Sequence, residues 1–120
     1  MISTYTFTLA NIKKMSHPGA IIENEFFKPK QLSRYGVSQD TGIPQSRLSL
    51  IIKGKRGITA DTSLRLSAYF GLAPDYFLNL QTQYDLYCQT KKNRNKYLAI
   101  KSSSTRIKTF QTLKSGVGKK

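Results

Sequence analysis

Apolar residues recur three and four positions apart through residues 17–90, which is the spacing of residues on one face of an α-helix. Capping and helix-ending residues interrupt this pattern at short intervals, so it predicts five helices in succession. The fold class expected from the pattern is therefore all-α. The expected helices lie at about 19–27, 33–42, 44–53, 59–71 and 74–90.

Local signals set these boundaries. Ser33 and Thr59 each carry a hydroxyl that suits the N-cap position, and Pro44 suits the first residue of a helix. Gly42 suits the left-handed conformation that ends a helix in a tight turn. His17 stands at the entry to the first helix, where we expect a cap or loop residue and not a metal ligand.

The third and fourth predicted helices differ in how much of their surface is apolar. In the third, Leu48, Ile51 and Ile52 share an inner face, and the outer face is left mostly to small and polar residues. In the fourth, apolar residues lie on both sides, with Leu64 and Ala68 on one of them. We therefore expect the fourth helix to be buried nearly all round.

The fifth predicted helix carries a stripe of large residues spaced 3, 4 and 3 positions apart, as in a coiled coil: Phe77, Leu80, Tyr84 and Tyr87. Such a stripe belongs either to the core of the monomer or to a dimer surface, and the spacing suits both. Because this helix is long and comes last, a second copy of the chain has room to pack against it.

The positive charge of the chain is concentrated near its C-terminal end. The 120 residues include 20 Lys or Arg and 6 Asp or Glu, which gives a net charge of +14. Residues 91–120 hold ten of these cations and no acid, whereas residues 1–90 hold ten cations and all six acids. Clustered cations favour a polyanionic partner. The basic end is either an arm that follows a nucleic-acid backbone or a solvated end with incidental charge.

Composition divides the chain into three parts. Residues 1–14 form an N-terminal extension, in which the alternation of positions 3–9 favours a short strand. Residues 15–92 form the helical domain, and Met15 at its start is a candidate translation start that N-terminal sequencing would test. Residues 93–120 form a basic tail rich in Ser, Thr and Lys, which we expect to be solvated or poorly ordered.

The residue types argue against several classes of function. A single cysteine, Cys88, cannot form an intramolecular disulfide framework and favours a reducing cytosol. The chain has one histidine, few carboxylates, no Cys/His cluster and no phosphate-binding glycine loop, so we expect no enzyme, metal or cofactor. Its apolar runs are too short to cross a membrane, and its N-terminus lacks a signal-peptide core. We therefore expect a cytoplasmic protein with no membrane partner.

The segment from Ser33 to Gly57, SRYGVSQDTGIPQSRLSLIIKGKRG, holds the most informative pattern. Two short helices are joined by a tight turn at Gly42, with a small residue, Ser38, four positions before it and a branched apolar residue, Leu48, six positions after it. The small side chain lets the second helix approach closely, and Leu48 fills the angle between the helices. This pattern predicts a helix-turn-helix, whose second helix enters the major groove of DNA.

Three stretches of the chain closely resemble the HigA-type antitoxins, a helix-turn-helix family of the Xre type: HPGAIIENEF, GIPQSRLSLIIKGKRGITADTSLRLSAYFG and APDYFLNLQTQYDL. The resemblance covers about residues 17–90. It implies a bacterial, five-helix, λ-repressor-like domain that forms a homodimer and binds double-stranded DNA at a palindromic operator. It also implies that such a protein represses its own operon and neutralises a small RelE-like ribonuclease toxin that cleaves mRNA. The basic tail departs from the compact pattern of the family.

The same resemblance assigns roles to single residues. Those placed to read base edges are Gln45, Ser46, Arg47 and Ser49. Those placed to hold phosphates, and so to fix the register on DNA, are Arg34, Lys53, Lys55 and Arg56. Gln can bind adenine and Arg can bind guanine through two hydrogen bonds, which gives about 1–3 kcal/mol of discrimination per pair. Without a DNA contact, the serines are plain solvated surface and the cations only add solubility.

Three functions are compatible with this sequence. The first is a DNA-binding antitoxin that regulates its own operon. The second is a stand-alone Xre-type transcriptional regulator that has no toxin partner. The third is a protein that neutralises its partner by protein–protein contact and whose helix-turn-helix is vestigial. Replacing Arg47 by Ala separates them, because it is expected to weaken operator binding and to leave toxin inhibition intact.

Overall fold

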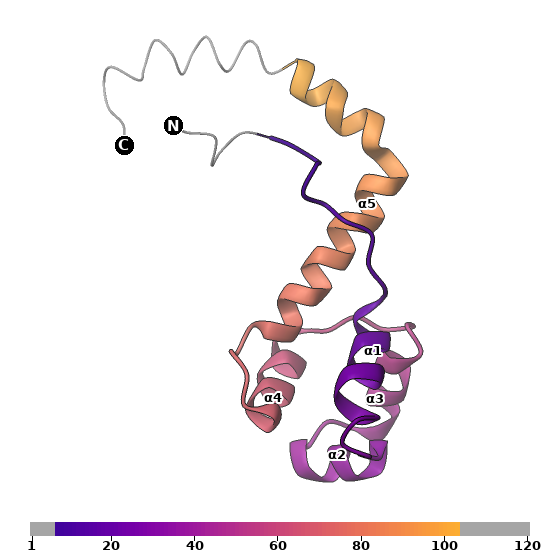
Figure 1. The fold of residues 1–120 in the computed structure, drawn as a ribbon, viewed down its shortest axis with the longest axis vertical. Helices are drawn as coiled ribbons and strands as arrows, with labels where there is room; N and C mark the ends of the chain where they lie inside the picture. Colours follow the sequence, from indigo (N-terminus) through magenta and orange to yellow (C-terminus); the bar gives the residue numbers. More distant parts are fainter. Residues whose placement is uncertain (1–6, 104–120) are drawn as a thin grey trace, which may run out of the picture. The chain divides into compact units, whose positions relative to one another are not determined.

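The computed structural model describes residues 7–103, in which every regular element is a helix and none is a strand. The chain divides into two compact units, Ile12–Tyr87 and a second unit made of the two ends, Met1–Asn11 with Cys88–Lys120. Figure 1 shows the elements in chain order: α1 Pro18–Ile21, the π-helix η2 Ile22–Phe27, α2 Arg34–Thr41, α3 Gln45–Ile52, α4 Ala60–Phe70 and α5 Tyr76–Ser102. The predicted all-α class is confirmed.

The helices of the Ile12–Tyr87 unit begin and end largely where the capping residues predict. The Ser33 hydroxyl accepts a hydrogen bond from the Gly36 N–H at 2.9 Å at the start of α2. The Thr59 hydroxyl accepts one from the Thr62 N–H at 3.3 Å at the start of α4. Gly42 ends α2 with a φ of 79°, in the left-handed region. These three sequence predictions are confirmed.

Nine apolar side chains, each at most 5% exposed, form the core of the Ile12–Tyr87 unit: Ile22, Phe27, Val37, Ile43, Leu48, Ile51, Ile58, Leu66 and Phe77. They come from every helix from η2 to α5 and from the two connections that flank α3. Each such side chain contributes roughly 1.5–3 kcal/mol by leaving water. α3 packs against both α1 and α2 (Figure 1).

Residues 22–27 form a π-helix, which the sequence pattern did not reveal. Its wider turn is marked by the Lys28 N–H, which donates to the Glu23 carbonyl at 2.9 Å, five positions back. Ile22 and Phe27 are also five positions apart, and both are buried in the core. The wider turn therefore brings onto one side two large residues that a regular α-helix would direct apart.

The stripe on α5 contributes its first half to the core of the monomer. Phe77 is fully buried, and Leu80 packs against the same core. Farther along, Tyr84 and Tyr87 are half-buried, and the Tyr84 ring meets the His17 ring edge-on at 5.1 Å. The core alternative for this stripe is therefore correct for Phe77 and Leu80.

The prediction that α4 is buried nearly all round is wrong. Leu64 is 54% exposed and Ala68 is also exposed. The buried side of α4 is built partly from small polar residues, because their hydroxyls find partners: Ser63 donates to the Pro74 carbonyl at 2.8 Å and accepts from the Leu78 N–H at 3.1 Å. Satisfied hydroxyls can face the interior at little cost and allow the start of α5 to lie close to α4.

Two helix boundaries also differ from the prediction. Pro44 is the N-cap of α3 and not its first helical residue, because its ψ of 139° is extended. The last helix begins at Tyr76 and continues to Ser102, far beyond the predicted end near Thr90, with non-helical torsions at Asn93. The high charge after residue 90 suggested a solvated tail, but the segment contains good helix formers and neither Gly nor Pro up to residue 102.

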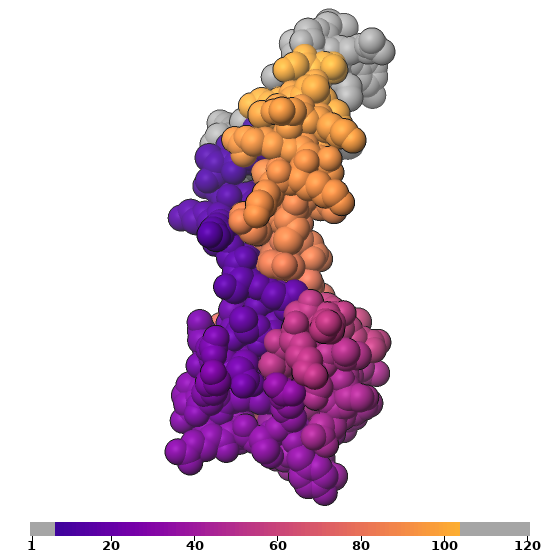
Figure 2. All heavy atoms as spheres, turned by 90° about the vertical axis from the view of Figure 1, so that its right-hand side faces the viewer, coloured from indigo at the N-terminus to yellow at the C-terminus, as the bar shows by residue number. Residues whose placement is uncertain are grey.

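The second unit is described for residues 7–11 and 88–103. Leu9 is only 8% exposed, and the indigo N-terminal segment lies beside the orange part of α5 (Figures 1 and 2). Residues 7–9 are not in a strand, so this part of the predicted strand at 3–9 is wrong, and positions 3–6 lie outside the described residues. The Gln89 amide oxygen accepts from the Asn93 amide at 3.4 Å and from the Tyr97 hydroxyl at 3.2 Å. These two hydrogen bonds connect residues on the two sides of the break in α5.

Most of the predicted basic tail lies outside the described residues. Its first part, 93–102, belongs to α5, and residues 104–120 are not described. Across residues 7–103, no helix combines the length and the apolar character needed to cross a membrane.

Candidate nucleic-acid interface

The turn between α2 and α3 is fixed by hydrogen bonds from both sides. The Ser38 hydroxyl donates to the carbonyl of Ile43 at 2.6 Å, and the Ile43 N–H donates to the Thr41 hydroxyl at 3.2 Å. Ile43 itself is fully buried. The prediction gave Ser38 only a steric role, and the hydrogen bond adds a second reason for a small hydroxyl residue at this position. Leu48 is buried in the core beside this turn, as predicted.

The four predicted base-reading residues all lie on α3 but differ in exposure. Gln45 and Ser46, in the first turn, are exposed. Arg47 and Ser49 are half-buried, and each contacts another part of the unit. Leu50, which is apolar, is 38% exposed. The amino end of α3 therefore offers an amide, a hydroxyl and a guanidinium to a molecule that approaches it.

Arg47 is part of a chain of polar contacts that the sequence did not predict. Its Nη1 lies 3.7 Å from Oδ2 of Asp61, in the first turn of α4. The same carboxylate accepts from Nε of Arg65, at 3.1 Å to Oδ1 and 3.0 Å to Oδ2. Arg65 in turn donates from Nη1 to the carbonyl of Thr41 at 2.9 Å, at the last residue of α2. This series of contacts begins on α3 and ends on α2, and so links the two helices of the helix-turn-helix.

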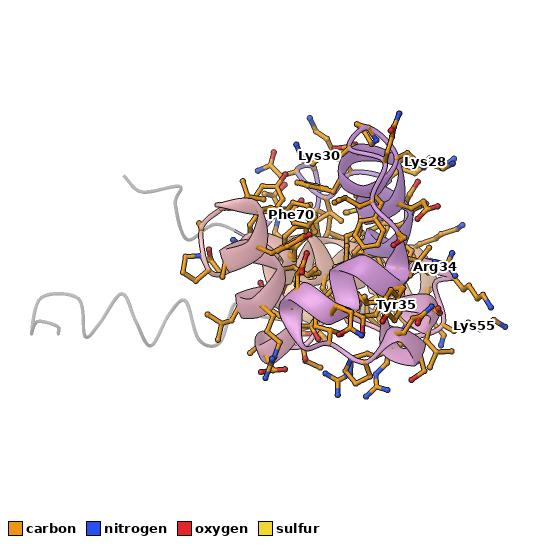
Figure 3. All side chains as sticks on the ribbon, turned by 90° about the horizontal axis from the view of Figure 1, so that it is seen from below. Lys28, Lys30, Arg34, Tyr35, Lys55 and Phe70 are labelled. Atoms are coloured by element: carbon orange, nitrogen blue, oxygen red, sulfur yellow. The ribbon has the colours of Figure 1, made fainter. Side chains whose placement is uncertain are left out.

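Arg34 and Ser49 join the start of α2 to the middle of α3. Nη1 of Arg34 donates to the Ser49 hydroxyl at 3.4 Å. The predicted phosphate-binding arginine and one predicted base-reading serine are therefore neighbours. Tyr35, next to Arg34, is 61% exposed and was assigned no role from the sequence (Figure 3). The sequence alone cannot distinguish an exposed tyrosine that contacts a partner from one that is ordinary surface.

The three cations after α3 lie on an anchored loop. Lys53, Lys55 and Arg56 are all exposed. The loop is held by the buried Ile58, whose N–H donates to the side-chain oxygen of Gln81 at 2.8 Å. Gln81 is itself 9% exposed, and its amide nitrogen donates to Asp85 at 2.9 Å. A polar residue of α5 thus fixes the path of the loop, a role that the sequence did not indicate.

Further cations surround these residues. Figure 3 shows Lys28, Lys30, Arg34 and Lys55 pointing outward around the rim of the Ile12–Tyr87 unit. Lys28 and Lys30 follow η2 and are exposed. They precede the helix-turn-helix, and the sequence pattern therefore indicated no role for them. Exposed cations attract phosphates whatever the base sequence.

His17 is the N-cap residue of α1. The His17 Nδ1 accepts from the Gly19 N–H at 2.9 Å, so the prediction of a capping role is confirmed. Within residues 7–103, no three His, Cys, Asp or Glu side chains are grouped so that they could hold a metal ion.

Comparisons with known proteins identify the family of the helix-turn-helix region. A helix-turn-helix family model matches residues 25–77. The virulence-associated protein I of Dichelobacter nodosus is 46% identical over 70 residues, and the aligned part spans 58% of this chain but only 65% of that relative. A solved structure, an addiction module antidote protein of a HigA family from Coxiella burnetii, is 38% identical, with a TM-score of 0.65, over 70% of this chain and 91% of that one.

A second solved structure contains DNA. The antitoxin HigA of Pseudomonas aeruginosa, solved with the higBA promoter, is 27% identical with a TM-score of 0.66, and the match covers 70% of this chain and 91% of that one. The family to which these matches point consists of DNA-binding helix-turn-helix antitoxins and regulators, not of enzymes. With 38% identity across nearly all of the Coxiella protein, the chain belongs to the HigA family.

Proposed function

We propose that this protein is a sequence-specific DNA-binding antitoxin that represses its own operon and neutralises a small RelE-like ribonuclease toxin. The observation that carries the DNA-binding part is the exposed amino end of α3 with basic residues on both flanks. It is supported by the DNA-bound relative from Pseudomonas aeruginosa, because the match covers 91% of that protein's chain. The toxin-neutralising part is supported by the names of the relatives, which are an antidote and an antitoxin.

In this proposal α3 lies in the major groove with its amino end toward the bases. Gln45 and Arg47 supply the two side chains that can each make two hydrogen bonds to a base edge, Gln to adenine and Arg to guanine. Ser46 and Ser49 are short and contact bases or water between the longer side chains. Each bidentate pair contributes about 1–3 kcal/mol of discrimination against a wrong base.

The proposed phosphate contacts come from two directions. Arg34 lies at the start of α2, and Lys53, Lys55 and Arg56 follow α3, so cations stand before and after the recognition helix. Contacts to phosphates on both sides hold the helix in one register without reading sequence. The protein acts as a homodimer in the bacterial cytoplasm, and its two α3 helices meet half-sites of a palindrome about one helical turn apart.

A footprint of the purified protein on the DNA upstream of its own gene tests the DNA-binding part. Wild-type protein at near-physiological salt is expected to protect a discrete palindrome. R47A is expected to lose that protection, while Q83A, which changes an exposed glutamine on α5 outside the helix-turn-helix, keeps it. If R47A binds the operator as tightly as wild type, the assignment of the recognition helix is wrong.

Co-expression with the neighbouring reading frames tests the toxin-neutralising part. A small protein that cleaves mRNA is expected to copurify with the chain, and R47A is expected to neutralise it as wild type does. Operator binding with no copurifying toxin would instead identify a stand-alone transcriptional regulator. Neutralisation without operator binding would mean that the helix-turn-helix is vestigial.

A further inference from the structure

Asp61 is an acid placed against the surface that we propose to bind DNA. The chain has only six acids against 20 cations, yet one of them lies 3.7 Å from Nη1 of Arg47, the proposed reader of guanine. A carboxylate at a DNA-binding surface is repelled by phosphates and lowers affinity for all sequences. Its presence at this position therefore calls for a role other than binding DNA.

The Asp61 carboxylate is oriented by hydrogen bonds from Arg65. Arg65, one turn later on α4, donates to both carboxylate oxygens, and its other end is bonded to the Thr41 carbonyl. Behind Arg65 lies Gly42, where a Cβ atom would stand 2.8 Å from Nη1 of that arginine. Arg65 thus links Asp61 to the end of α2, and the carboxylate presents its charge to Arg47.

Arg47, by contrast, is held loosely. Its distance of 3.7 Å to Asp61 is that of an ion pair and exceeds the usual length of a hydrogen bond. The Arg47 side chain is 30% exposed. Its guanidinium can therefore leave the carboxylate when a partner offers more than the ion pair does.

We propose that Asp61 is a positioning residue that sets the sequence discrimination of Arg47, an inference that rests on the proposed DNA-binding function. On non-specific DNA, a single phosphate competes with Asp61 for the guanidinium, so Arg47 adds little affinity. On the operator, a guanine offers two acceptors in the plane of the guanidinium and wins that competition. Asp61 thereby weakens non-specific binding more than specific binding, and raises the ratio between them.

A structural role for Asp61 makes a different prediction. As an acid in the first turn of α4, Asp61 also suits the helix dipole, and its pair with Arg65 is of the i, i+4 type. If this were its only role, removal of the charge would lower stability and leave sequence discrimination unchanged. Discrimination, and its dependence on Arg47, is therefore the property to measure.

The test uses the full chain with the D61N substitution and two duplexes, the footprinted operator and the same operator with the guanine contacted by Arg47 replaced. D61N is expected to bind the replaced duplex more tightly than wild type does, with a log–log salt slope steeper by about 0.9 for the one phosphate that Arg47 then binds. The ratio of the two affinities is expected to fall at least about fivefold, the lower end of what one bidentate pair discriminates.

Three further variants make the result decisive. In an R47A background, D61N is expected to change the ratio no further, because its effect acts through Arg47. D61E, which keeps the charge, is expected to restore most of the ratio and serves also if D61N folds poorly. Asp40 is an exposed acid on α2 that accepts a hydrogen bond from Tyr69 and does not contact Arg47. The D40N substitution is therefore expected to leave the ratio of the two affinities unchanged.

The outcomes separate this inference from the proposed function. A D40N effect equal to that of D61N, or a D61N effect that persists without Arg47, would show bulk charge and overturn the role of Asp61 while operator binding stands. A D61N ratio equal to that of wild type would overturn it as well. If R47A itself leaves operator binding unchanged, both the recognition-helix assignment and the role of Asp61 are wrong.

Discussion

Gly19 in α1 lies directly against the main chain of Ile51 at the end of α3. A Cβ atom at position 19 would overlap the Ile51 carbonyl group, at 2.7 Å from its carbon, and would stand 2.9 Å from the Cα of Ile52. Both residues of this pair are buried. The absence of a side chain at position 19 therefore allows α1 to pack against the backbone of the recognition helix and to fix where that helix lies.

The substitution G19A is expected to lower the free energy of unfolding by about 3 kcal/mol or more, because backbone atoms cannot move aside as a side-chain tip can. Urea unfolding of the purified variant measures the loss. G71A is the matched control, since Gly71 has a φ of 73° but nothing within 4 Å of an added Cβ. That control is expected to lose only about 1–2 kcal/mol for the left-handed backbone. Equal losses in the two variants would mean that the contact between α1 and α3 is not tight.

Gln81 is the second residue whose importance shows only in the structure. Q81A would leave the buried N–H of Ile58 without its partner, so a loss of about 1–3 kcal/mol in unfolding free energy is expected. Because the loop before Ile58 carries Lys55 and Arg56, operator affinity is expected to fall as well. Q83A, an exposed glutamine on the same helix, is expected to stay within about 0.5 kcal/mol of wild type. The idea fails if both glutamines give the same loss.

The features predicted correctly from the sequence are those that a few neighbouring residues decide. A hydroxyl at Ser33 or Thr59 reaches an N–H three positions later, and Gly42 adopts a left-handed conformation for local steric reasons. The inner face of α3 follows from the helical period, with Leu48 and Ile51 buried. Such signals are present in the chain before any tertiary contact forms.

The features that were missed depend on contacts between distant positions. Gly19 and Ile51 are 32 positions apart, and Arg47 and Asp61 are 14 apart, so no local pattern links either pair. The proposed base-reading set came from the family resemblance, which places four residues of α3 at positions that read base edges. That Arg47 within this set is ion-paired with an acid of another helix could not be predicted, because the pairing depends on how α4 packs against the helix-turn-helix.

The stability of the protein is expected to fall in mildly acidic solution through His17. Its Nδ1 accepts the Gly19 N–H, which only an unprotonated nitrogen can do. Burial of the ring lowers the pKa of His17 below its usual 6.5, and the nearby Asp85 carboxylate opposes this only in part. As the pH falls through 6.5, the unfolded chain takes up the proton first, so the stability that is complete above this pH declines toward the lower pKa of the folded state.

Urea midpoints at about pH 7.5 and about pH 5.5 measure this effect, and the midpoint is expected to be lower at the acidic pH. H17N keeps a side-chain acceptor at the N-cap but cannot titrate, so its midpoint is expected to change less between the two values. A wild-type protein whose midpoint rises on acidification would contradict the direction of the pKa shift.

The C-terminal half of α5 gives a prediction about salt dependence. Residues 88–102 carry five cations and no acid, and Lys92 and Lys96, which lie before and after the break at Asn93, are both exposed. If this segment binds DNA phosphates, the double variant K92Q/K96Q flattens the log–log salt dependence of operator binding by about 0.9 for each phosphate that is no longer bound. The charge-conserving variant K92R/K96R is expected to keep the slope of wild type.

Truncation after residue 103 removes the other five cations of the basic end without cutting into the helix, and separates their contribution from that of α5. A slope that neither the glutamine variant nor the truncation changes would show that the basic end takes no part in DNA binding and that its charge serves only solvation.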